Sequence, residues 1–207
     1  MIQVFNIKEG LFYGLLNLKE FAAQENLSAK RDIEFNGREY LMKHLINKDC
    51  QTAYDDKGKP YLVGDIRHIS ISHSHDMLAV IVNEHEPTGI DIELIRDKVI
   101  KIKHKFLTQD ELIDANNDVE KLLIYWAAKE TLYKIYGLKE VDFIGNLFVK
   151  PFTKHKLGLI NGEINLPNFT ESFHLNYQIL DDYVLVYALN KIMRIETSTM
   201  YDLNRQK

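Results

Sequence analysis

Two long helical patterns, each followed by short strand-like runs, constrain the fold of this chain more than any other feature. The first runs from about Ser28, whose side chain suits an N-cap, to about Ile46. The longer one runs from about Val119 to Tyr136, where Gly137 suits a C-cap. The neighbouring runs alternate apolar and polar residues, which is typical of strands. A chain of 207 residues can bury a core built from both element types, so we expect an α+β fold.

The two halves of the chain carry helices and strands of similar size, and no linker rich in Pro, Gly or Ser separates them. This symmetry predicts two pseudo-symmetric α/β lobes, each a helix packed on a small, mainly antiparallel sheet. We place the N-terminal lobe in residues 1–86 and the C-terminal lobe in residues 87–207, ending in a polar tail from about Thr197. Residues 84–87 should form a hairpin-like turn between strands, and residues 15–21 should be helical.

Charge and cysteine content exclude several classes of protein. Lys and Arg number 26 against 30 Asp and Glu, whereas a general binder of nucleic acid or anionic membrane needs a large basic excess. The single cysteine, Cys50, excludes an internal disulfide framework and a cysteine-rich metal cluster. The sequence has neither a signal-peptide pattern at its start nor an apolar run of about 18 residues. We therefore expect a soluble cytoplasmic protein without nucleic-acid or membrane partners.

The segment Thr88–Glu93 contains the first candidate for chemistry. Side chains alternate faces along a strand, so Asp91 and Glu93 share one face while the neighbouring isoleucines point to the other. Two carboxylates on one face form a hard-oxygen cluster of the kind that binds Mg²⁺. Alternatively, these carboxylates belong to the solvated outer face of an edge strand.

The segment Trp126–Lys134 on the longer helix contains the second candidate. Trp126, Glu130 and Lys134 are spaced four apart and share one broad helix face, with Lys129 and Tyr133 beside them. This arrangement has the chemistry to bind a metal ion through Glu130 and phosphate oxygens through Lys129 or Lys134. Alternatively, it is an ordinary surface ion pair worth about 0.2–0.5 kcal/mol.

The segment Ile69–His75 ends an alternating strand in a polar corner. Its Ser72-His73-Ser74 tip offers hydrogen-bond donors for a phosphate group or a bound water. Alternatively, it is a hairpin turn in which serine side chains cap the backbone. No Gly-x-Ser-x-Gly elbow surrounds these serines, which argues against a serine hydrolase.

The order of these segments resembles the motif series of the 4′-phosphopantetheinyl transferases. Gly58-Lys59-Pro60, then Ser72-His73-Ser74, then Gly-Ile-Asp-x-Glu at 89–93, then Trp-x-x-Lys-Glu-x-x-x-Lys at 126–134 follow one another at similar spacing. The resemblance is closest to the Sfp-type branch and continues more weakly through the closing strands. It implies the fold of this family, with the two lobes described above.

The resemblance also implies an activity, the transfer of the 4′-phosphopantetheine arm of coenzyme A to a serine hydroxyl of an apo acyl or peptidyl carrier protein. Mg²⁺ would be the cofactor, and 3′,5′-ADP would leave. Asp91, Glu93 and Glu130 match the acidic Mg²⁺ ligands of the family, and Glu130 is also a candidate base. Lys134 matches the lysine that contacts the coenzyme A phosphate, so Glu130 and Lys134 are the candidate catalytic pair.

The remaining matches concern the pocket for coenzyme A. The family has a lysine–proline pair beside the adenine, a histidine near the phosphates and a basic N-terminal helix that receives the 3′-phosphate. Ile69-Ser70 stands here where the family commonly has Phe-Asn. Glu111 falls where the family has a further glutamate near the active site. The implied coenzyme A contacts are Lys59, Pro60, Ser72, His73, Asp91, Lys129, Lys134, Lys30 and Arg31, with Arg38 near the last two.

The expected protein partner is a carrier protein, which is typically acidic. The lysines of residues 98–105 form a candidate basic patch that would steer it, although they equally suit a solvated helix face. The length of the chain implies a monomer that supplies both lobes. Two other functions compete: a module that docks a carrier protein without transfer, and a metal-dependent nuclease. The four charged residues of the two longer motifs argue against the first, and Leu94-Ile95 after Glu93, with the net charge of −4, against the second.

Overall fold

The computed structural model describes residues 2–138 and 140–192 of the chain. These residues form α-helices together with a four-stranded, a five-stranded and a small two-stranded sheet, in which every strand pair is antiparallel. The expected α+β class is confirmed, while the pseudo-symmetry of two lobes and their boundary at residue 86 stay predictions. The expected polar tail from Thr197 lies outside the described residues.

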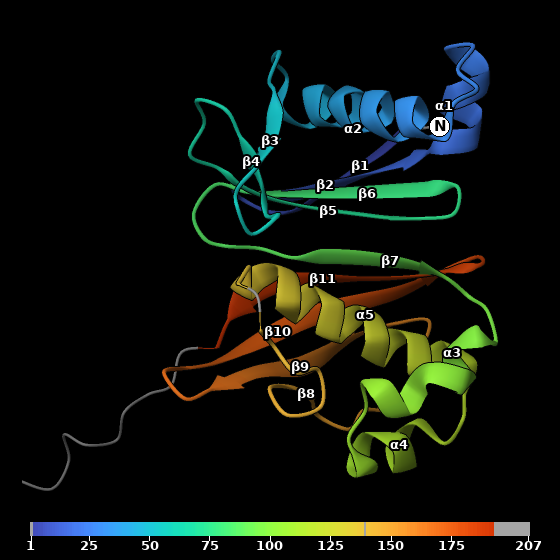
Figure 1. The fold of residues 1–207 in the computed structure, drawn as a ribbon, viewed down its shortest axis with the longest axis vertical. Coiled ribbons are helices and arrows are strands. Elements are labelled where there is room, and N and C mark those ends of the chain that lie inside the picture. The colour runs from blue at the N-terminus through green and yellow to red at the C-terminus, as the bar shows by residue number, and fades with distance from the viewer. Residues whose placement is uncertain (1, 139, 193–207) are drawn as a thin grey trace, which may run out of the picture.

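The four-stranded sheet belongs to the first part of the chain and has the order β1-β2-β6-β5. Helix α2 packs on its strands β2 and β6, as Figure 1 shows. The strands β3 and β4 form the separate two-stranded sheet beside it. The elements of this part are β1 (Ile2–Lys8), β2 (Leu11–Asn17), α1 (Leu18–Gln24), α2 (Lys30–Ile46), β3 (Thr52–Tyr54), β4 (Pro60–Leu62), β5 (His68–Ser74) and β6 (Met77–Asn83).

The five-stranded sheet belongs to the second part and has the order β7-β11-β10-β9-β8. Helix α5 lies across it and contacts β7, β11, β9 and β8. The elements of this part are β7 (Ile90–Leu94), α3 (Lys98–Ile102), the 3₁₀ turn η1 (Lys103–Lys105), α4 (Gln109–Ala115), α5 (Val119–Tyr136), β8 (Leu147–Val149), β9 (Leu157–Leu166), β10 (Phe169–Leu180) and β11 (Tyr183–Lys191).

Three local predictions are wrong, two of them for tertiary reasons. Helix α2 has Ala29 instead of Ser28 as its N-cap, and no side chain caps it. Residues 15–17 continue β2 instead of starting a helix, because Leu15 and Leu16 are buried on opposite faces of that strand. Helix α1 begins only at Leu18, where the Asn17 side chain accepts a hydrogen bond from the Glu20 N–H at 3.0 Å. Residues 84–87 do not close a hairpin, since β6 already has β2 and β5 on its two edges and β7 pairs with β11.

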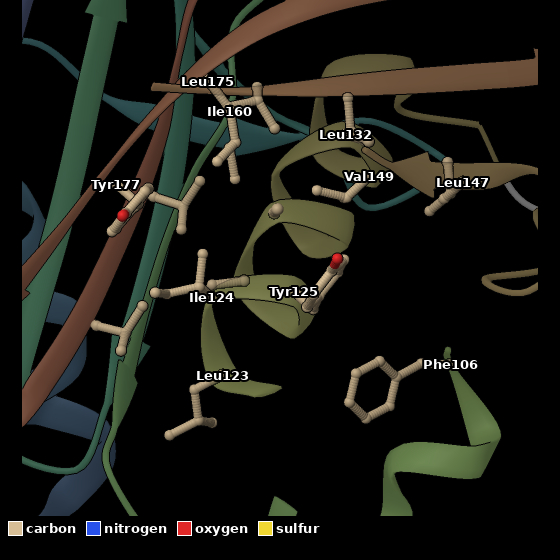
Figure 2. Packing of buried hydrophobic residues seen from close by; sticks show 14 of the residues in the cluster. Phe106, Leu123, Ile124, Tyr125, Leu132, Leu147, Val149, Ile160, Leu175 and Tyr177 are labelled. Carbon is tan, nitrogen blue, oxygen red and sulfur yellow. The ribbon is translucent and has the colours of Figure 1, made fainter. Parts of the chain in front are cut away.

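Helix α5 is the centre of the larger core. Side chains on several sides of the helix are buried, among them Ile124, Tyr125 and Leu132 (Figure 2). The sheet side chains Ile160, Leu175 and Tyr177 belong to the same apolar cluster. Because so much of α5 is covered, a polar side chain on it must find partners inside the protein or face a cavity.

The two large sheets face each other across a second apolar layer. Tyr13 and Leu15 of β2 meet Ile90 and Ile92 of β7 there, together with Tyr187 of β11. This layer brings the edge strands β5 and β7 into contact, and in Figure 1 β7 lies between the four-stranded sheet and α5. None of the helices described is both long and apolar enough to cross a membrane.

Gly89 lies just before β7, where the chain runs close to the backbone of α5. A Cβ added there would lie 2.3 Å from the backbone oxygen of Thr131, which cannot move aside without shifting the helix. We expect Gly89→Ala to lower the free energy of unfolding by about 3 kcal/mol, measured by urea denaturation. Gly64→Ala is the control, because Gly64 has φ +71° and no heavy atom within 4 Å of the added Cβ; it should cost only about 1 kcal/mol. Equal losses in both variants would contradict this packing argument.

Candidate active site

A cavity of about 280 Å³ opens where the two parts of the chain meet. One wall comes from β5 and the turn before β4, and the other comes from the C-terminal half of α5. Its lining mixes apolar and charged groups, as is usual for small-molecule pockets. The lining residues are Tyr54, Lys57, Gly58, Lys59, Pro60, Ile69, Ser70, Ile71, His73, Glu130, Tyr133, Lys134 and Gly137.

Asp91 lies on β7 beside this cavity and is only 4% exposed. Its Oδ1 atom accepts hydrogen bonds from Lys134 Nζ at 2.7 Å and from Ser72 Oγ at 2.7 Å. Its Oδ2 atom is buried and has no hydrogen-bond partner within residues 2–138 and 140–192. Asp91 is therefore not on a solvated outer face of a strand, and one of its oxygens is available to a ligand.

Glu93, two residues further along β7, is held at both oxygens. Trp126 donates its indole N–H to Oε1 at 2.7 Å, and Ser74 donates its hydroxyl to Oε2 at 3.0 Å. Burial raises the pKa of Glu93, and the nearby Asp91 raises it further, because both oppose a negative charge there. The two strand carboxylates thus interact through space, as the alternation along β7 predicts.

Glu130 reaches the cavity from α5. Burial raises its pKa to about 7, with a further contribution from Asp91 and a smaller one from Glu93. Lys134, one turn further along, donates to Asp91 and to the Ile90 carbonyl at 2.9 Å. Lys134 thus connects α5 to β7. An ordinary surface ion pair with Glu130 would instead stay within α5.

A divalent cation fits the chemistry of this carboxylate set. Asp91 Oδ2 is an unpartnered oxygen among the described residues. Burial and, to a smaller extent, the charge of Asp91 raise the pKa of Glu93 and Glu130, and a cation would offset both effects. Among residues 2–138 and 140–192, however, no three His, Cys, Asp or Glu side chains are already arranged as a metal site. Binding would therefore require local adjustment of these side chains.

Lys59, Pro60 and His73 all line the cavity. Lys59 Nζ donates to the Ile135 carbonyl at 3.1 Å, which satisfies an acceptor near the C-terminal end of α5. Burial lowers the pKa of Lys59. His73 is exposed, and its Nε2 lies 3.3 Å from Glu34 of α2. These three predicted residues are thus brought together with Glu130 and Lys134.

Lys129 and Glu111 do not line the cavity, contrary to the expectation from sequence. Lys129 is 0% exposed and donates to Glu111 Oε2 at 2.7 Å and to the carbonyls of Phe106 and Phe143 at 2.7 and 2.8 Å. These three bonds use all three N–H groups of an ammonium. Glu111 also accepts from the backbone N–H groups of Thr108 and Val149. The pair is a buried structural element that joins α4, α5 and β8.

Ser72, Lys30 and Arg31, which the sequence implied as coenzyme A contacts, do not line the cavity either. Ser72 is buried, and its hydroxyl is bonded to Asp91 and to the Ile92 N–H. The Lys30 side chain is 87% exposed beside Glu34, and neither Lys30 nor Arg31 lines the cavity. Lys30 and Arg31 lie at the N-terminal end of α2. The basic start of this helix therefore does not form a wall of the cavity.

Several side chains support the site through contacts that the sequence did not indicate. Tyr133 lines the cavity directly, and Trp126 and Ser74 hold Glu93. Arg38 donates to the hydroxyl of Tyr54, another lining residue, at 2.9 Å and lies over its ring. The position of Ser74 could have been predicted, because side chains alternate along β5 and Ser74 lies on the same face of the strand as Ser72.

The second half of the chain matches a family model. Residues 87–188 match the model described as the 4′-phosphopantetheinyl transferase superfamily. This part of the chain is therefore similar to the 4′-phosphopantetheinyl transferase superfamily. It is also 33% identical over 107 residues to the 4′-phosphopantetheinyl transferase gsp of Aneurinibacillus migulanus, a match that covers 48% of this chain and 44% of that protein. The match thus spans less than half the length of this relative.

The raised pKa of Glu130 predicts how stability depends on pH in the metal-free protein. The folded state holds this proton up to about pH 7, whereas the unfolded chain releases it near 4.5, so the contribution of Glu130 to stability is lost as pH rises through this window. At pH 8 we expect Glu130→Gln to be more stable than the unmodified chain by about 1–3 kcal/mol, allowing for solvent screening. At pH 4 the two should unfold alike. Urea denaturation at both pH values measures this, and a constant difference would contradict the assignment.

Proposed function

We propose that this protein transfers the 4′-phosphopantetheine arm of coenzyme A to a serine hydroxyl of an apo carrier protein, with Mg²⁺ as cofactor and release of 3′,5′-ADP. The observation that carries the proposal is that Asp91 and Glu93 from β7 meet Glu130 and Lys134 from α5 at the edge of a cavity. Similarity to the superfamily supports the transferase activity and the use of coenzyme A.

Asp91 and Glu130 are the residues that would bind Mg²⁺ first, with Glu93 as a third ligand. Asp91 offers its unpartnered Oδ2, and Glu130 lines the cavity. When bound, the cation would neutralise charge on the diphosphate that otherwise repels a nucleophile. Glu93 is already held by Trp126 and Ser74, so it would help to fix the position of the set.

Glu130 suits the role of general base toward the serine hydroxyl. Its carboxylate lines the cavity, where it would accept the proton of a hydroxyl bound there. Lys134 suits the stabilisation of the leaving diphosphate. Two of its three N–H groups bond to Asp91 and Ile90, which leaves one for a phosphate oxygen.

The cavity walls supply the contacts for coenzyme A. Lys59 and Pro60 form the part of the wall that we assign to the adenine, and His73 is the exposed donor for the phosphates. Tyr133 adds an aromatic surface in the same lining. The structural pair Lys129 and Glu111 is not part of this proposal.

A basic patch is proposed to receive the acidic carrier protein. Lys98, Lys101 and Lys105 are exposed on α3 and η1, and no carboxylate pairs with them among the described residues. These elements follow β7 directly, so the patch continues from the strand that carries Asp91. A monomeric state, implied by the family resemblance, and a cytoplasmic location, expected from the composition of the sequence, belong to the same proposal.

The direct test incubates an apo carrier protein and coenzyme A with the protein, in the presence and absence of Mg²⁺. Mass spectrometry should show one added phosphopantetheine per carrier with the unmodified chain, and a loss of at least about 100-fold in rate with Glu130→Ala. The control is Lys105→Ala, which leaves the carboxylate set intact and should reduce mainly the apparent affinity for the carrier. Binding of several carriers without any mass gain would instead support a docking module.

Calorimetry of coenzyme A binding separates the two lysines of α5. Lys134→Ala removes a charge at the cavity and should weaken binding about 10-fold or more. Lys129→Met removes a charge from the core, so it should lower the unfolding midpoint because Glu111 is left without its cation. In the folded fraction its affinity for coenzyme A should stay unchanged. Weaker binding of coenzyme A by Lys129→Met, with unchanged binding by Lys134→Ala, would show that Lys129 and not Lys134 contacts the ligand.

A further inference from the structure

The edge strands β5 and β7 belong to different sheets, and serine hydroxyls of β5 form hydrogen bonds to the backbone of β7. β5 pairs only with β6, and β7 only with β11. The hydroxyl oxygens of Ser70, Ser72 and Ser74 accept hydrogen bonds from the backbone N–H groups of Ile90, Ile92 and Leu94 at 3.2, 3.3 and 3.1 Å. Every second residue of β5 thus contacts every second residue of β7 with a constant offset of 20 positions, and we call these three residues the serine ladder.

Two members of the serine ladder also donate to carboxylates. Ser72 donates to Asp91 Oδ1 at 2.7 Å and Ser74 donates to Glu93 Oε2 at 3.0 Å. Each of these hydroxyls therefore accepts from a β7 backbone N–H and donates its single proton to the acidic side chain of the residue just before that N–H. Ser70 makes the backbone contact but no contact with a carboxylate.

We propose that Ser72 and Ser74 are positioning residues for the metal site, a role that rests on the proposed function of Asp91 and Glu93. The hydroxyl of Ser72, with Lys134, occupies Asp91 Oδ1 and leaves Oδ2 as the free ligand atom. The hydroxyl of Ser74, with Trp126, fixes both oxygens of Glu93.

This arrangement explains why the positioning groups come from the other sheet. A hydroxyl that accepts from the β7 backbone and donates to a β7 side chain locks the side chain relative to its own strand. An alanine at the same place leaves the carboxylate free to rotate toward other donors. The affinity for a cation therefore depends on contact between β5 and β7, and so on the packing of the two sheets.

Ser70 is the matched control, because all three serines lose an equivalent backbone contact when replaced by alanine. The probe is Mn²⁺ alone, with free Mn²⁺ measured by electron paramagnetic resonance in the absence of coenzyme A. Ser72→Ala and Ser74→Ala should weaken Mn²⁺ binding about 10- to 100-fold. Ser70→Ala should stay within about twofold of the unmodified chain. Ser74→Thr keeps the hydroxyl on a β-branched side chain that suits a strand, and it should restore most of the affinity.

Thermal unfolding of the same variants separates positioning from stability. All three alanine variants should have a lower Tm, since each leaves one backbone N–H without its acceptor, and Ser72→Ala and Ser74→Ala also lose a hydrogen bond to a carboxylate. If the loss of Mn²⁺ affinity were proportional to the loss of Tm in all three alanine variants, the serine ladder would only stabilise the fold and the proposal would be wrong. The proposal would also be wrong if Ser74→Thr bound Mn²⁺ as weakly as Ser74→Ala. Failure of the unmodified chain to bind Mn²⁺ would overturn the metal part of the proposed function as well.

Discussion

The buried contact between Asp91 and Lys134 holds the candidate active site together. A carboxylate that is 4% exposed would be costly without a partner, and Lys134 supplies the opposite charge from α5 while Ser72 supplies a hydroxyl from β5. One side chain of β7 thus connects three elements from both parts of the chain. The site depends on the relative positions of β5, β7 and α5. These positions determine the wall of the cavity, the free oxygen of Asp91 and the place of Glu130.

The site combines groups that oppose each other, which is common where a protein gives up stability for function. Three carboxylates approach closely enough for Asp91 to raise the pKa of both Glu93 and Glu130. The core around α5 offsets this cost, and part of the compensation is itself ionic, because Lys129 and Glu111 form a fully bonded pair inside it. The two lysines of one helix therefore serve different purposes, one in the core and one at the cavity.

Sequence patterns predicted many of the elements, and they placed Asp91 and Glu93 on a strand and Glu130 on the long helix, as the structure does. The helix Val119–Tyr136 has the predicted bounds and the predicted C-cap, Gly137. The destination of Lys129 was not predictable, because spacing on a helix gives a face but not what covers it, and α5 is covered on several sides. The strand at residues 15–17 was missed for a related reason, since a run of apolar residues fits a doubly buried strand as well as a helix.

The bond between Lys59 and the Ile135 carbonyl has a consequence for any dissection of this protein. Lys59 belongs to the turn before β4, yet its stem packs over Gly137 so closely that an added Cβ there would lie 2.6 Å from it. A fragment restricted to residues 87–188 would retain the acidic cluster but only one wall of the cavity, and it would uncover the apolar layer around Ile90 and Ile92. The cavity is thus formed jointly by the two parts of the chain, and neither part forms it alone.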